Sequence, residues 1–451
     1  MQLKAATLGW SPVAARVGSV QSAAPMRVID LRADDTDQHL MNRRYSPEPA
    51  LVSQVASILS SVREKGNDAL IEFTKRFDGT ELTANELRVS EEESIDAMTE
   101  VTPELIEALK AASRNVRDFA LRSKRIDWTD KNEQGATVGE RFDPLDRVGI
   151  YVPAGTAPLV STAIMTVSLA AAVGVSEIVV ASPVGSSKKM NPGLLAALRI
   201  AGATEIYKIG GAQAIGALAF GTDSIKSVSK IFGPGNAYVT DAKRQVFGYV
   251  AVDLLPGPSE ILVLADRTAN PSWVAADLLA QAEHGHGSVI CLIAFEEDVI
   301  NAVRHEMDRQ ITGLERQSYL KTVVEKDAFF VLVRDAAHAI KIINEFAPEH
   351  LSLAVKEAEQ IAELVRTAGA IFIGNYSPVA AGDFVAGPSH ELPTGGAGKS
   401  FPGLTVDQFQ RRTSLVRYDK DSLRKSVPII SEFSAIERLD AHGRSATIRF
   451  D

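Results

Sequence analysis

Residues 148–152, Val-Gly-Ile-Tyr-Val, form an apolar run that opens a regular alternation of strand and helix patterns and decides the fold. A helical pattern over 162–173, a strand pattern over 177–181, a second helix over 192–201 and a third strand over 205–209 follow. A helix that connects neighbouring strands in this way makes them parallel. The alternation therefore predicts a parallel sheet covered by helices.

A second set of strand patterns begins near Glu260. The apolar runs are 261–265, 288–294, 328–333 and 370–373. We therefore expect an α/β chain with two Rossmann-like, parallel-sheet domains.

Residues from about 47 to 126 show helical patterns instead. The three segments are 52–64, 68–77 and 102–122, and the last has Pro103 in its first turn. We interpret this region as helical support for the sheets.

Bulk composition narrows the class of protein. The chain has 451 residues, of which 45% are hydrophobic, so it is long enough for at least two domains. Its net charge of -9 and pI near 5.5 argue against a nucleic-acid or anionic-membrane partner and favour a small one. No run of about eighteen apolar residues occurs, so we expect no transmembrane helix. The single cysteine, Cys291, lies in a strand pattern and is predicted to be a buried core residue in a reducing compartment.

The first 26 residues contain no Asp or Glu, which is a feature of organellar transit peptides. The alternative is an upstream start codon, with the native protein beginning at Met26. We favour the second interpretation, treat 1–25 as a poorly ordered or non-native extension, and expect a cytoplasmic protein.

Gln281 and His284 lie three residues apart at the end of a helical pattern that Gly285 stops. Side chains at this spacing share a helix face. Imidazole nitrogen suits zinc, and an amide oxygen is an unusual ligand that also serves. The alternative is that both side chains are solvated caps of the helix end.

Glu349 and His350 are adjacent at the boundary between a helical pattern and the apolar run 351–355. Burial and nearby charge can tune both groups toward neutral pKa, which suits a general base and a water activator. The alternative is a surface pair.

Two further clusters hold candidate polar groups. Asp383 and His390 lie in the Gly- and Pro-rich segment 381–396, a composition typical of functional loops and also of plain turns. His442 follows Glu437 by five residues near the C-terminus, and by itself it would be a surface histidine.

Taken together, these clusters resemble the histidinol dehydrogenase family, zinc enzymes that complete histidine biosynthesis. The resemblance extends from Met26 to the C-terminal region. Besides the clusters above, its most specific stretches are 148–153, 210–215, 232–236 and 257–260.

The resemblance implies one zinc ion per subunit. Its ligands would be Gln281, His284, Asp383 and His442, with His442 supplied by the partner subunit of an intertwined homodimer. The ion would hold the amino and imidazole nitrogens of the substrate L-histidinol.

The resemblance also implies catalytic and substrate-binding roles. His350 matches the family's general base, and Glu349 matches the residue that activates water. Ser259, His390 and Glu437 match substrate contacts, together with His350 and the four metal ligands; Glu437 would reach the substrate imidazole from the partner.

The implied reaction oxidises L-histidinol to L-histidine through bound L-histidinal and reduces two NAD molecules in turn. Tyr151, Gln213 and Asn236 match the family's NAD contacts. The chain lacks the G-x-G-x-x-G fingerprint, so composition alone does not name NAD. The turn at Gly210-Gly211 precedes an apolar helix, and its amides suit either a phosphate or an ordinary strand-to-helix connection.

The resemblance further implies how the domains are divided, with small N- and C-terminal extensions that embrace the partner subunit. Residues 26–129 would contribute helices to the first α/β domain, 130–259 would form the second, NAD-contacting domain, 260–402 would return to the first with the zinc and catalytic residues, and 403–451 would form a C-terminal arm.

Three other functions compete with this interpretation. A related zinc and NAD dehydrogenase would oxidise another small alcohol, such as a sulfonated diol, but Glu437 disfavours an anionic substrate. A zinc-binding protein without catalysis would not need Glu349 and His350, and a zinc hydrolase would leave the NAD positions unexplained. Two departures from the family lie beside matched positions, namely His286, which we interpret as a surface histidine, and Glu391, where an apolar residue is common.

Overall fold

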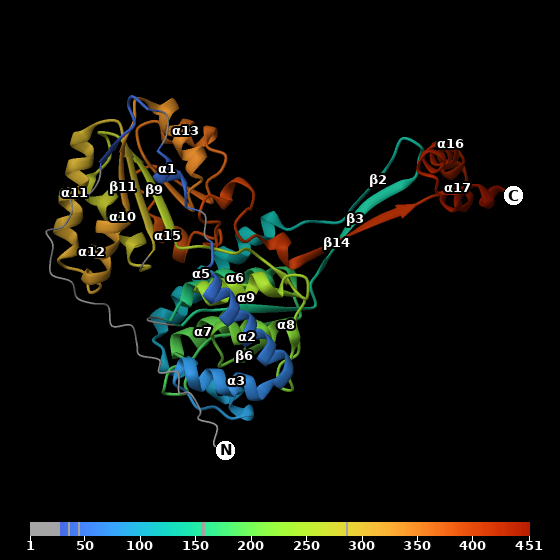
Figure 1. Cartoon of the computed structure of the whole chain (residues 1–451), viewed down its shortest axis with the longest axis horizontal. Helices are drawn as coiled ribbons and strands as arrows, with labels where there is room; N and C mark the ends of the chain where they lie inside the picture. Colours follow the sequence, from blue (N-terminus) through green and yellow to red (C-terminus); the bar gives the residue numbers. More distant parts are fainter. Residues whose placement is uncertain (1–27, 35–36, 44–45, 155–157, 286) are drawn as a thin grey trace, which may run out of the picture.

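The structure is a computed structural model that describes residues 28–34, 37–43, 46–154, 158–285 and 287–451. These residues form two helix-covered parallel sheets and an arm that projects from them (Figure 1). The predicted α/β class with parallel sheets is confirmed. The expected extension at 1–25, the start at Met26 and the histidine His286 lie outside the described residues. None of the described helices combines the length and apolar character that a membrane crossing requires.

The five-stranded lobe consists of a parallel sheet with the order β6-β5-β4-β7-β8 and the helices packed on it. Its strands are β4 (Arg147–Tyr151), β5 (Glu177–Ala181), β6 (Glu205–Tyr207), β7 (Lys230–Phe232) and β8 (Ala251–Val252). Its crossover helices are α6 (Val160–Val173), α7 (Pro192–Ala201), α8 (Gly211–Phe220) and α9 (Ala237–Val246). The predicted alternation is confirmed, and β4 is buried along its whole length, as expected for a strand covered on both faces.

The six-stranded lobe has the parallel order β1-β11-β10-β9-β12-β13. Its strands are β1 (Val28–Asp30), β9 (Glu260–Ala265), β10 (Val289–Ala294), β11 (Ala328–Leu332), β12 (His350–Ala354) and β13 (Ala370–Ile373). Its helices are α1 (Gln38–Met41), α10 (Pro271–Ala282), α11 (Glu297–Ile311), α12 (Gln317–Lys326), α13 (Ala336–Phe346), α14 (Ala358–Leu364) and α15 (Val379–Phe384). Cys291 is fully buried in β10, and burial raises the pKa of its thiol to about 12, so the core assignment is confirmed.

The N-terminal helices pack on the five-stranded lobe, whereas we expected residues 26–129 to support the first α/β domain. These helices are α2 (Pro49–Lys65), α3 (Asn67–Phe73), α4 (Glu91–Glu100) and α5 (Pro103–Ser123), with a π-helix at Thr74–Asp78 and a short 3-10 helix at Ala84–Glu86. Their apolar faces, including Val55 and Val116, share one core with β4 and β5. Of the N-terminal elements that the structure describes, β1 and α1 belong to the six-stranded lobe, since β1 pairs with β11 and α1 contacts α13. Helical periodicity defines an apolar face but not the sheet that covers it.

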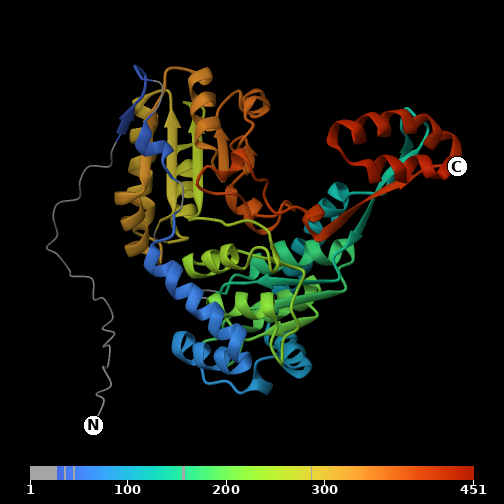
Figure 2. The same ribbon diagram turned by 45° about the vertical axis from the view of Figure 1, so that its right-hand side comes forward.

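The arm contains an antiparallel sheet and two helices. Strand β3 (Thr137–Pro144) pairs with β2 (Trp128–Lys131) on one side and with β14 (Gln410–Arg417) on the other. Helices α16 (Lys420–Glu437) and α17 (Asp440–Thr447) pack on each other at its tip, which lies away from both lobes in two views (Figures 1 and 2). The arm therefore includes the β2–β3 hairpin as well as the expected C-terminal tail. Short 3-10 helices lie at Ala397–Lys399, Val406–Phe409 and Ile448–Phe450.

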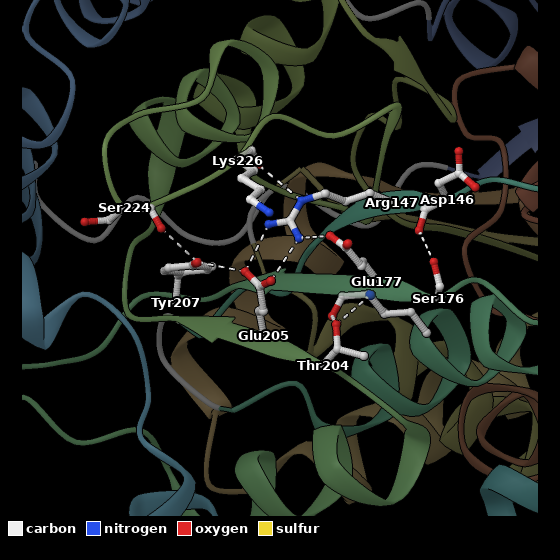
Figure 3. Close-up of polar contacts among 10 residues, drawn as sticks. Asp146, Arg147, Ser176, Glu177, Thr204, Glu205, Tyr207, Ser224 and Lys226 are labelled. Carbon is white, nitrogen blue, oxygen red and sulfur yellow. Dashed lines mark hydrogen bonds and ion pairs between the residues drawn. The ribbon is translucent and has the colours of Figure 1, made fainter.

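Arg147 ties the amino ends of three neighbouring strands together in the five-stranded lobe (Figure 3). Its guanidinium donates two hydrogen bonds to Glu205, at 2.9 and 3.0 Å, and also contacts Glu177. Tyr207 donates to the same Glu205 carboxylate at 2.8 Å. The hydrogen bonds from Arg147 hold the pKa of Glu205 down to about 2.

We expect Arg147→Met to lower the free energy of unfolding by about 2 kcal/mol near neutral pH, because charge-assisted hydrogen bonds are lost. A carboxyl with a depressed folded-state pKa stabilises the fold above its unfolded value, near 4.5, and this stabilisation disappears as pH falls toward about 2. Denaturant unfolding should show the difference between wild type and variant shrinking across that window. A pH-independent difference would contradict the assignment. Arg199→Met, which breaks a more exposed pair with Glu91, serves as the matched control.

Candidate active site

The candidate catalytic pair lies where the chain turns from α13 into β12. Ala347 caps α13 in a left-handed conformation, with φ 51°, which a non-glycine residue adopts only when its surroundings require it. The turn places Glu349 and His350 at the amino end of β12, beside the amino end of β9. The tertiary structure therefore buries a pair that could equally have been on the surface.

The ring of His350 is held in one tautomer. Its Nδ1 lies 3.0 Å from the backbone carbonyl oxygen of Glu260, and because a carbonyl only accepts, Nδ1 is the donor. Nε2 is then the basic nitrogen, and it lies 3.6 Å from Oδ1 of Asp383. Burial lowers the pKa of His350, which keeps the ring neutral and able to accept a proton.

The buried carboxyl group of Glu349 has few contacts that would stabilise its charged form. Its Oε2 accepts a hydrogen bond from the backbone N–H of Glu260 at 2.7 Å. Burial raises its pKa well above the usual range, and the nearby carboxylates of Glu260, Glu391 and Asp383 raise it further. A raised pKa lets this carboxyl hold a proton at a higher pH than an exposed glutamate does, which suits proton exchange with a bound reactant.

His390 joins the two lobes at the site. Its Nδ1 donates to the backbone oxygen of Asp383 at 3.0 Å, and its Nε2 lies 3.3 Å from Oγ1 of Thr162 in α6. Nε2 is also 3.4 Å from Oε1 of Glu391. Burial alone would lower the pKa of His390, but the carboxylates of Glu391 and Asp383 outweigh burial and raise it.

Three of the four predicted metal ligands come from the six-stranded lobe. Gln281 lies in the last turn of α10 and is 2% exposed, and neither its amide oxygen nor its amide nitrogen has a hydrogen-bond partner among the described residues. His284 is exposed just beyond this helix. Asp383 lies in α15, which packs against α10.

These residues fit a zinc ion only in part. A buried amide oxygen that receives no hydrogen bond is available to bind a metal ion. An imidazole and a carboxylate are also suitable zinc ligands. Within the described part of one chain, however, no group of three or more His, Cys, Asp or Glu side chains is arranged to hold a metal. The described residues of one chain therefore do not by themselves form a complete metal site.

The other two predicted site residues, Glu437 and His442, lie on the arm. Glu437 ends α16 and His442 lies in α17, and both are exposed. The tip of the arm is remote from α10 and α15 in both views (Figures 1 and 2). One chain therefore does not bring them to Gln281 and Asp383.

The predicted NAD contacts lie at the carboxyl ends of the five-stranded sheet, where open α/β sheets bind ligands. The Tyr151 hydroxyl, at the end of β4, accepts the backbone N–H of Gly211 at 3.1 Å, and burial raises its pKa to about 12. Gln213 is 1% exposed, and both polar atoms of its side chain lack partners among the described residues. Asn236 caps α9 by accepting two backbone N–H groups.

Sequence reasoning gave no role to Glu260, which connects the site. Its backbone contacts both Glu349 and His350, while its buried carboxylate pairs with Arg43 and accepts the backbone N–H of Gly395 at 3.0 Å. Ser259 precedes it and is half-buried. An acidic residue that opens an otherwise apolar strand was the available signal, since a buried carboxylate requires partners.

A family model, related sequences and a solved structure all indicate the same family for this chain. The family model for histidinol dehydrogenase matches residues 41–450. The histidinol dehydrogenase of Geobacillus kaustophilus is 42% identical over 88% of this chain and 93% of that protein, and the Heliobacterium mobile enzyme is 40% identical over 94% and 100%. A crystal structure of histidinol dehydrogenase from Elizabethkingia anophelis matches with a TM-score of 0.89 and 34% identity, covering 94% of this chain and 98% of that one.

Proposed function

Because this chain belongs to the histidinol dehydrogenase family, we propose that it oxidises L-histidinol to L-histidine in two NAD-dependent steps, with one zinc ion per subunit. It is accordingly an oxidoreductase of histidine biosynthesis. The observation that carries the mechanistic proposal is the buried pair of Glu349 and His350 beside Asp383.

In the first step, His350 takes the hydroxyl proton of the alcohol on Nε2. The Glu260 carbonyl holds Nδ1–H, so that the basic nitrogen faces the site throughout. As the proton leaves the oxygen, the carbon that bears this oxygen gives up a hydride, for which NAD would be the acceptor, and L-histidinal forms. Burial of the pair keeps bulk water away from the reactive aldehyde.

In the second step, Glu349 activates a water molecule for attack on the aldehyde carbon. Its raised pKa brings the carboxyl closer to the range in which it can accept and return a proton. The hydrated aldehyde then loses a second hydride, and the carboxyl group of L-histidine results. Two adjacent residues thus handle the protons of both steps at one carbon.

The proposed zinc ligands are Gln281, His284 and Asp383 from one subunit and His442 from its partner. When bound, the ion would fix the amino and imidazole nitrogens of the substrate. The unpartnered amide oxygen of Gln281 supports this assignment. Ser259, His390 and the partner-donated Glu437 are the proposed substrate contacts, and a carboxylate suits a cationic ring.

NAD is the proposed hydride acceptor, and its contacts would be Tyr151, Gln213 and Asn236 at the edge of the five-stranded sheet. The unpartnered side chain of Gln213 supports a polar ligand there. The hydrogen bond between Thr162 and His390 joins this lobe to the six-stranded lobe, which contains the proposed catalytic pair, and so supports a cofactor bound between them. We propose that these two lobes are the two domains of the chain.

We propose a homodimer in which the arm reaches the partner's site. Apolar side chains on α16 are exposed to an extent that a monomer would not favour: Phe433 is 64% and Ile436 is 82% exposed. Burying them against a second copy would bring Glu437 and His442 of one subunit near the proposed metal ligands in the six-stranded lobe of the other. The proposed location is the cytoplasm, which suits a chain with one buried cysteine.

The proposal predicts two NADH per histidine when zinc-loaded protein receives NAD together with L-histidinol as the only alcohol. Both products should disappear together after treatment with a chelator and return when zinc is restored. Absorbance of NADH and chromatographic quantification of histidine measure the ratio. One NADH per product, or release of an aldehyde, would contradict the four-electron reaction.

A related dehydrogenase for another small alcohol, such as a sulfonated diol, is not favoured. The relatives that match nearly the whole chain at 40 to 42% identity are histidinol dehydrogenases. If folded, zinc-loaded protein did not turn over L-histidinol, other small alcohols would have to be tested as substrates.

A further inference from the structure

Lys243 and Asp253 form a buried ion pair in the five-stranded lobe to which the proposed reaction gives no role. Lys243 lies in α9, and Asp253 directly follows β8. Their side chains are 1% and 2% exposed, and Nζ of Lys243 contacts Oδ1 of Asp253. The loss of hydration offsets most of the attraction between two buried charges, so such a pair adds little net stability. Its contacts with the surrounding backbone are therefore the informative feature.

Both members of the pair bind the backbone of one residue, Gly233. The Gly233 N–H donates to Oδ2 of Asp253 at 2.8 Å, and Nζ of Lys243 donates to the Gly233 carbonyl oxygen at 2.8 Å. Asp253 is held in turn, since its backbone N–H donates to the carbonyl oxygen of Ile231 in β7 at 3.1 Å. A carboxylate on the N–H and an ammonium on the carbonyl fix the orientation of both peptide planes that flank Gly233.

Gly233 passes very close to the end of β4. Its φ is 102°, and a Cβ atom at this position would lie 2.1 Å from the carbonyl oxygen of Tyr151. The parallel pairing of β4 with β7 continues to Ile150 and Phe232, so Tyr151 and Gly233 leave the sheet side by side. Glycine has many accessible backbone conformations, and the two charged contacts select the one that fits here.

The loop that begins at Gly233 ends at Asn236, the residue that caps α9. Oδ1 of Asn236 accepts the N–H groups of Tyr238 and Val239, so its amide nitrogen would be the donor to a bound cofactor. Two of the proposed NAD contacts, Tyr151 and Asn236, therefore lie on either side of Gly233. The conformation of Gly233 determines how these two contacts are placed relative to each other.

We propose that Lys243 and Asp253 are positioning residues that hold Asn236 in place relative to Tyr151 for the binding of NAD. This inference rests on the proposed function, in which both Tyr151 and Asn236 contact NAD. A loop that is ordered before its ligand arrives does not lose conformational freedom on binding, so the pair should increase the affinity for NAD.

The test is the dissociation constant of NAD, measured by titration calorimetry on the zinc-loaded enzyme without L-histidinol. The double variant Lys243→Met/Asp253→Asn removes both charges together, so that neither is left buried alone, and the new amide oxygen can still accept the Gly233 N–H. The Gly233 carbonyl loses its donor, and we expect NAD to bind about tenfold more weakly. KM for NAD should rise by a similar factor, while KM for L-histidinol and the zinc content stay unchanged.

Arg147→Met is the matched control, since it removes a buried charge from the amino ends of the same sheet, opposite the proposed NAD contacts. It should lower thermal stability and leave the affinity for NAD unchanged. Gln213→Ala changes a proposed NAD contact directly. Unchanged affinity in the double variant, together with weakened binding in Gln213→Ala, would overturn the positioning role and leave the proposed function intact. Unchanged affinity in Gln213→Ala as well would overturn the proposed NAD site and the inference with it.

Hydrogen exchange of the wild-type enzyme tests the same inference without any variant. The Gly233 N–H should exchange slowly before NAD is added, because Asp253 already binds it. Mass spectrometry of overlapping peptides that contain Gly233 measures the exchange with and without NAD. Protection that arises only in the presence of NAD would mean that the cofactor orders this loop, and it would overturn the role of the ion pair.

Discussion

Replacing His350 with glutamine should lower kcat for L-histidinol oxidation by about a thousandfold, because the alcohol proton would lose its proposed acceptor. Glutamine keeps much of the volume of the ring and can still donate to the Glu260 carbonyl, so the variant should fold and bind zinc. Steady-state NADH formation measures the loss, and metal analysis of the same samples verifies that the zinc content is unchanged.

The pH profile adds a readout that a structural defect would not change. A base works above its pKa, so wild-type kcat should hold as pH falls until the His350 pKa is passed. Burial lowers that pKa below 6.5. The acidic limb should therefore lie below that of an ordinary histidine, and it should be absent from His350→Gln. His305→Gln, which alters an exposed histidine of α11, is the control and should match wild type. A variant with near-normal kcat would exclude His350 as the base.

We expect that mixing two inactive homodimers, His442→Ala and His350→Ala, restores activity once their subunits exchange. Each mixed dimer has one complete site, formed by an intact His350 and the partner's intact His442, and one site that lacks both. Random exchange makes half of the dimers mixed, so recovery should reach about a quarter of wild-type activity. Each homodimer alone should remain inactive.

The physical basis of this result is the position of the arm. His442 and Glu437 are exposed at its tip, while Gln281 and Asp383 lie in the six-stranded lobe (Figure 2). Native mass spectrometry of one isotopically labelled homodimer verifies exchange independently of activity. Verified exchange without recovery would show that the two residues act in the same chain, and that the arm must then fold back on its own lobe.

Much of the fold could be predicted from local patterns. The strand at Glu177–Ala181, the helix at Pro192–Ala201 and the strand at Ala370–Ile373 coincide with the predicted ranges. Each is decided by apolar periodicity within a short segment and by flanking Gly, Pro or Asn, which act over a few residues. The core position of Cys291 follows for the same reason.

Other features depended on which distant segments meet. The helix patterns near the N-terminus were right, but their apolar faces pack on the five-stranded lobe and not on the sheet we expected. The hairpin of β2 and β3 was not predicted. Strand β3 has a second neighbour, β14, whose residues lie far along the chain, so the sheet is complete only after folding. Burial pattern offered little guidance there, since all four residues of β2 are exposed.

The candidate site divides in the same way. Residue types and their spacing identified Glu349 and His350 as a candidate pair, and resemblance to a family provided the roles now proposed. Only the folded chain shows that the Glu260 backbone donates to Glu349 across 89 positions and accepts from His350. Periodicity and turn chemistry are local properties that a linear sequence displays directly. Burial, pKa and the pairing of remote groups arise when sheets and helices pack, so they became visible only in three dimensions.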